Sequence, residues 1–172
     1  MDIKESVGKY FKLEMPGETN GKSPSATELL KLWEEFSRDS SDIGHEFSNH
    51  LPSLKGTQKI SVVKKIIKTC QDLHLYANES IDYTKEVINS MTHLDELEQG
   101  PDAFVGKIFS IFTGINTVKS KIKSMRVNEI KRFEKIGNKF KIKYNKLNSE
   151  YFNVCYEAER VFFKTFKGNP IN

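Results

Sequence analysis

The chain has 172 residues, which is enough for one domain with its own core. Charged residues make up 29% and apolar residues 37%, and the 12 Phe and 6 Tyr exclude a disordered tail. The net charge is only +4, but between Lys107 and Lys146 twelve Lys and Arg residues stand against two acids, a local charge of +10 that leaves −6 for the rest. This asymmetry indicates either a polyanionic partner or a solvated helix face balanced by acidic neighbours.

Few features of the sequence indicate the cellular compartment of the protein. The two cysteines, Cys70 and Cys155, are far apart and cannot make a disulfide framework, so we expect a reducing, cytoplasmic environment. Residues 1–5 contain no apolar stretch of the kind that signal peptides have. The longest apolar-rich stretch, 103–115, is too short and too interrupted to span a bilayer, which leaves peripheral membrane association open.

The first half of the chain predicts two helices. Residues 1–24 are expected to form a short helix near 4–12 and then a loop rich in Pro and Gly. A helix over 25–50 should begin with a capping box, in which Ser25 and Glu28 satisfy each other's backbone N–H groups. We expect the polar run 39–42 to bend or end this helix, and Pro52 to stop it.

Two longer helices are predicted over 57–97 and 102–168, separated by Gly100 and Pro101. Apolar residues recur every three or four positions along both, and Gly114 and Gly137 are expected weak points. At about 1.5 Å per residue the two helices would be roughly 60 and 100 Å long. The sequence therefore predicts an all-α, elongated antiparallel bundle of about three long helices over 25–172, with coiled-coil-like packing. A second copy would cover the remaining apolar face, so we expect a homodimer.

The sequence lacks the common catalytic and metal-binding motifs. It contains no Gly-rich phosphate loop and no hydrolase or metalloprotease motif. Cys70 and His74 are four residues apart, but a zinc site needs three or four ligands and no second pair is visible. We therefore expect no enzymatic activity, no metal and no cofactor.

The candidate binding residues lie in the third predicted helix. Its first turns are apolar around most of their circumference, so Phe109 and Phe112 are candidates for an apolar wedge, unless they are buried between protomers. The candidate membrane-binding residues that follow are Lys119, Lys121, Lys123, Arg126, Lys131, Arg132, Lys135 and Lys139. They predict an anionic membrane surface or an acidic protein as partner. Nucleic acid is not expected, because stacking platforms and helix-turn-helix signals are absent.

One resemblance concerns this basic segment. The run 128–135, Asn-Glu-Ile-Lys-Arg-Phe-Glu-Lys, followed by Phe140, Lys141, Tyr144 and Tyr151, resembles the last helix of BAR domains, especially those of sorting nexins. The resemblance covers about a quarter of the chain and implies a crescent-shaped dimer that binds curved anionic membranes through basic residues.

A second resemblance concerns the N-terminal part. Tyr10-Phe11, Gly17-Glu18, Ser23-Pro24 and the run 33–39, Trp-Glu-Glu-Phe-Ser-Arg-Asp, look like the end of the formin homology domain that nucleates actin. In that family the segment closes the domain, whereas here it opens the chain. This resemblance implies an actin-binding helical module. A protein–protein adaptor is the remaining alternative to a BAR-like membrane scaffold.

Overall fold

The computed structural model describes residues 2–16, 25–99 and 117–163, with side chains except those of 97–99 and 117–122. Every regular element in these ranges is a helix, which confirms the predicted all-α class. The elements are α1 (Ile3–Tyr10), α2 (Ala26–His50), the 3-10 helix η1 (Leu51–Ser53), α3 (Thr57–Gln99) and α5 (Thr117–Phe162).

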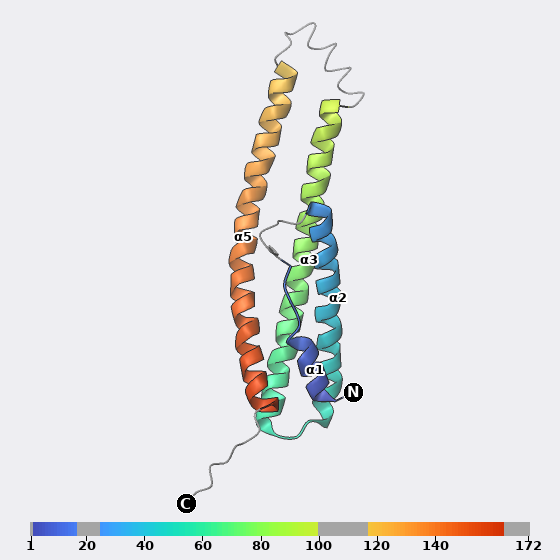
Figure 1. Ribbon diagram of the computed structural model, residues 1–172. Helices are drawn as coiled ribbons and strands as arrows, with labels where there is room; N and C mark the ends of the chain where they lie inside the picture. The colour runs from blue at the N-terminus through green and yellow to red at the C-terminus, as the bar shows by residue number, and fades with distance from the viewer. Residues whose placement is uncertain (1, 17–24, 100–116, 164–172) are drawn as a thin grey trace, which may run out of the picture.

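The long helices run antiparallel, and α3 lies between α2 and α5 (Figure 1). Helix α2 returns into α3 through η1 and Gly56, whose φ of 98° is a conformation that favours glycine. Helix α1 packs across α2 and α5 near the lower end of the bundle in Figure 1. Helix α3 therefore organises the fold, because it contacts both other long helices.

The helix boundaries follow local signals in most places. The predicted capping box is confirmed: the Ser25 side chain accepts from the Glu28 N–H at 3.2 Å, and the Glu28 carboxylate accepts from the Ser25 N–H at 2.8 Å. The polar run 39–42 does not end α2, which continues to His50, and Ser40 is buried within it with its hydroxyl donating to the Ser37 carbonyl at 3.0 Å. The parts of the predicted third helix at 102–116 and 164–168 lie outside the described residues, as does Gly114.

The core is concentrated in the lower half, where α1 meets the three long helices. Tyr10, Phe47, Ile66 and Leu73 are fully buried there. Helices α2 and α3 approach closely at Gly44, where a Cβ atom would lie 3.1 Å from the Cβ of Cys70. The sequence puts small residues at this crossing, and the close packing follows from them.

Helices α3 and α5 extend beyond the first turn of α2 at the other end of the molecule (Figure 1). We name this part the arm and define it as residues 83–96 of α3 and 123–138 of α5. The ring of Tyr83 stacks on Phe140 at 5.1 Å and meets Phe133 edge-on at 6.0 Å, where the arm joins the rest of the bundle. Gly137 lies within the uninterrupted helix α5, and a Cβ atom there would be 3.3 Å from the Tyr83 hydroxyl. Helix α2 still reaches the lower end of the arm, where Glu34 pairs with Lys85 at 3.8 Å, and beyond α2 the described part of the arm consists of α3 and α5.

Candidate functional site

The eight predicted basic residues do not form one surface. The side chains of Lys119 and Lys121 lie outside the described part, as do the proposed wedge residues Phe109 and Phe112. Arg126 donates to Asp95 of α3 at 2.8 Å. Arg132 makes ion pairs with Glu86 of α3 and with Glu129 of its own helix. These two arginines join α5 to α3. Part of the basic segment is therefore balanced by acidic residues of a neighbouring helix, which is one of the two alternatives that the sequence indicated.

Ion pairs continue along the same side of α3 and α5. Lys143 pairs with Glu79, and Lys65 of α3 pairs with Glu157 at 2.7 Å. All of these side chains are partly or largely exposed to solvent, so each pair adds on the order of 0.2–1 kcal/mol or less to stability. Their main consequence is geometric, because they fix which side of α5 faces α3.

Three further lysines of α5 are exposed and differ from these paired cations. Lys131, Lys135 and Lys139 are exposed, and no ion pair holds any of them among the described residues. Spacings of four residues place them on one ridge of the helix, which continues through Ile142 and Lys146. Ile142 is 73% exposed, and Lys146 has only a 3.9 Å contact with Glu150. The ridge is therefore cationic, with an apolar side chain in its middle.

Below the lysines the same side of α5 becomes aromatic. Phe152 is 60% exposed, Tyr156 65% and Phe163 44%. Lys135, Ile142, Tyr156 and Phe163 are separated by multiples of seven residues, so they share one face of the helix. We name the whole surface the outer face of α5, and it consists of Lys131, Lys135, Lys139, Ile142, Lys146, Phe152, Tyr156 and Phe163.

The aromatic part of this face was missed by the sequence reasoning, which followed the buried periodicity through Tyr151 and Val154. A signal was present, because aromatic residues occur in adjacent pairs at Tyr151-Phe152 and Phe162-Phe163. Neighbours on a helix are about 100° apart and cannot both face the core. The hydroxyl of Tyr151 donates to the Tyr10 carbonyl at 2.8 Å, which turns Phe152 toward solvent.

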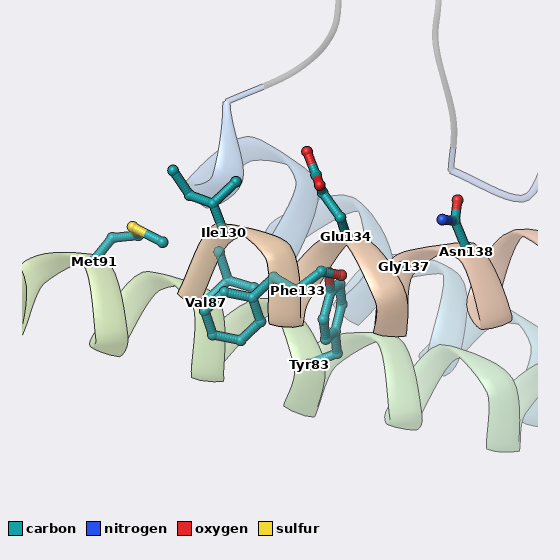
Figure 2. A pocket seen from close by; sticks show the side chains of 8 residues that line it. All are labelled: Tyr83, Val87, Met91, Ile130, Phe133, Glu134, Gly137 and Asn138. Atoms are coloured by element: carbon teal, nitrogen blue, oxygen red, sulfur yellow. The ribbon is translucent and has the colours of Figure 1, made fainter. Parts of the chain in front are cut away.

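A second feature is a shallow groove of about 590 Å³ between α3 and α5 in the arm. Figure 2 shows Tyr83, Val87 and Met91 coming from α3, with the rings of Tyr83 and Phe133 between the two helices. The α5 side is completed by Ile130, Phe133, Glu134, Gly137 and Asn138. The lining is mainly apolar, and Ile130 is 43% exposed at its edge.

One polar cluster has the residue types of a catalytic site. The Ser6 hydroxyl lies 3.2 Å from both the Glu46 carboxylate and His50 Nε2, and Lys9 donates to Glu46 at 2.7 Å. These hydrogen bonds, with Lys9 first, lower the pKa of the Glu46 carboxyl. Ser6 is fully buried, however, and a nucleophile must reach its substrate. The cluster therefore fastens α1 to α2.

The described residues also bear on metal binding and on insertion into a membrane. No group of three or more His, Cys, Asp or Glu side chains is arranged to hold a metal ion there. None of the described helices combines the length and the apolar character needed to cross a bilayer. No protein-family profile, curated protein or solved structure matches this chain.

Proposed function

We propose that this protein is a non-enzymatic helical module that binds anionic membrane surfaces through the outer face of α5. The observation that carries the proposal is the composition of that face, which combines exposed lysines with exposed Ile142 and aromatic side chains. Lysines gain on the order of 1 kcal/mol each near an anionic leaflet. Tyr and Phe favour the boundary between headgroups and acyl chains.

The dimensions of the outer face suit a surface rather than a small ligand. From Lys131 to Phe163 it runs along roughly 50 Å of helix at about 1.5 Å per residue. Lys131, Lys135 and Lys139 have no ion pair among the described residues, so binding lipid would break none at these positions. The resemblance of 128–151 to the last helix of BAR domains supports the same partner. The predicted homodimer belongs to this proposal, because two outer faces on one particle would bind a membrane with greater avidity.

The test is sedimentation with phosphatidylserine vesicles and with phosphatidylcholine vesicles at two salt concentrations. We expect binding only to the anionic vesicles, and weaker binding at high salt. Replacing Lys131, Lys135 and Lys139 together by Glu should lower the apparent affinity by at least about 100-fold, since three contributions of about 1 kcal/mol are removed and repulsion is added.

A matched control is available on α3. Lys59, Lys64 and Lys68 are exposed and have no ion pair among the described residues, so their replacement by Glu changes the net charge by the same amount. If this control loses as much affinity as the α5 variant, net charge and not the outer face determines binding, and the proposal fails.

The same experiment separates the membrane from the acidic-protein alternative. Actin filaments are acidic, and a basic ridge alone would suit them too. Sedimentation with actin filaments but not with phosphatidylserine vesicles would replace this proposal by the formin-like one. Sedimentation with neither would favour a protein–protein adaptor.

A further inference from the structure

One serine in the basic segment has the flanking charges of a phosphorylation site. Ser124 has lysines three positions and one position before it, at Lys121 and Lys123, and Arg126 two positions after it. No other serine of the sequence has basic residues at all three of these positions. Serine kinases with acidic substrate grooves select a hydroxyl flanked in this way, because the cations of the substrate pair with carboxylates of the enzyme.

The structure leaves Ser124 accessible. Its side chain is exposed, as are those of Lys123 and Met125 on either side. The Ser124 hydroxyl has no hydrogen-bond partner among the described residues. A kinase binds its substrate in an extended conformation, so α5 must open locally around the serine. Ser124 lies about two turns after Thr117, the first residue of α5, and opening an exposed turn near a helix end gives up few packing contacts.

Ser124 also continues the outer face of α5 upward in Figure 1. It precedes Lys131, Lys135 and Ile142 by seven, eleven and eighteen residues, and each of these spacings returns to nearly the same side of an α-helix. Lys131 is about 10 Å away along the helix axis, which is comparable to the Debye length of about 8 Å at physiological salt. A charge on Ser124 would therefore act on the same part of a membrane surface as the lysines.

We propose that Ser124 is a phosphorylation site and that its modification weakens the binding of the outer face to anionic membranes. This inference rests on the proposed function and adds its regulation. In the reaction, the Ser124 hydroxyl oxygen forms a bond to the γ-phosphorus of ATP, and the bond from that phosphorus to the β,γ-bridging oxygen breaks. ADP leaves, and the hydroxyl proton passes to a carboxylate base of the kinase. Phosphoserine carries a charge of about −1.5 to −2 at neutral pH, which an anionic leaflet repels.

The first measurement tests the site without any membrane. The full chain is incubated with ATP and the catalytic fragment of protein kinase C, and the modified peptides are located by mass spectrometry. We expect phosphate on Ser124, and a large loss of incorporation in Ser124→Ala. Ser61 of α3 is the matched control, because it is also exposed near the start of a long helix but has no basic residue three positions or one position before it. Phosphate on other residues with Ser124 unmodified would overturn the site, whether or not the protein binds membranes.

The second measurement is sedimentation of the phosphorylated and unmodified chains with phosphatidylserine vesicles. The phosphorylated chain should bind about 10- to 30-fold more weakly, because 1.5 to 2 negative charges are added near the leaflet. Ser124→Asp should bind about fivefold more weakly, since it adds one negative charge. Ser61→Asp changes the net charge equally on another helix and should bind like the wild type.

The outcomes separate this inference from the proposed function. If the unmodified chain binds the vesicles and phosphorylation of Ser124 leaves its affinity unchanged, the regulation is wrong and the proposed function stands. An equal loss in Ser124→Asp and Ser61→Asp would also overturn the regulation, because net charge alone would then explain the effect. If the unmodified chain does not bind the vesicles, the proposed function fails and the regulation fails with it, while the first measurement still decides the site.

Discussion

The aromatic end of the outer face gives the sharpest single prediction. Replacing Phe152 and Tyr156 by Ser should weaken binding to anionic vesicles while leaving the fold intact. Both side chains are mostly exposed, at 60% and 65%, so the folded state loses little packing when they are shortened. The structure therefore separates their contribution to binding from any contribution to stability.

The magnitude follows from the area available for insertion. A Phe or Tyr side chain buries roughly 200 Å² when it is fully covered, so about 120 Å² of each remains to be covered by lipid. At about 25 cal/mol per Å², complete insertion would contribute roughly 3 kcal/mol for each residue. Insertion at the headgroup boundary is partial, so half of this value is the appropriate estimate. The double variant should then bind roughly 100-fold more weakly.

The assay is vesicle sedimentation at fixed salt, with Leu75→Ser as the control. Leu75 is 58% exposed on α3, so this variant removes a comparably exposed apolar side chain from another helix. Unfolding by urea should give the same midpoint for the Phe152/Tyr156 variant as for the wild type. Unchanged vesicle affinity in this variant, or an equal loss in Leu75→Ser, would refute insertion of the aromatic patch.

Three further predictions concern the lower half of the bundle. Gly44→Val should destabilise the fold by about 1–3 kcal/mol in urea unfolding, because a Cβ there meets Cys70 at 3.1 Å; equal stability would mean that α2 and α3 separate without cost. The pKa of the Glu46 carboxyl is lowered in the folded state, first by its hydrogen bond from Lys9. The carboxylate therefore stabilises the fold at pH values above its unfolded pKa of about 4.3, and this stabilisation is lost as the pH falls through the folded pKa. The loss of stability from pH 7 to pH 3 should accordingly be smaller in Lys9→Met, and an equal loss would contradict this. Burial raises the pKa of the Cys70 thiol to about 12, so in a Cys155→Ser variant a thiol reagent at pH 8 should react only as fast as the protein unfolds.

Local patterns in the sequence determined most of the secondary structure. The capping box at Ser25 and Glu28, the apolar period through 57–97 and the turn at Gly56 depend on neighbours within a few residues, and such interactions form in any helix with this sequence. Pro52 similarly lies just past the last residue of α2. Fold class was therefore predictable from the chain alone.

The direction in which each side of α5 faces was decided only by tertiary contacts. The sequence grouped Arg132 with Lys131 and Lys135 because all three are basic and adjacent. The structure separates them, since Glu86 of α3 pairs with Arg132 from 46 residues away. Acidic residues that far apart in sequence come together only when the helices pack, so no local pattern can indicate which cations they hold.

The covered and open parts of the bundle were likewise a matter of tertiary structure. Periodicity marks an apolar face along the whole of α5, but it does not say how far along that face another helix reaches. Among the described residues, α1 covers the face at Tyr151, and the groove leaves it open at Ile130. Helix lengths, loop paths and the docking of α1 set that limit, and these depend on packing free energies summed over the whole molecule rather than on the residues of α5.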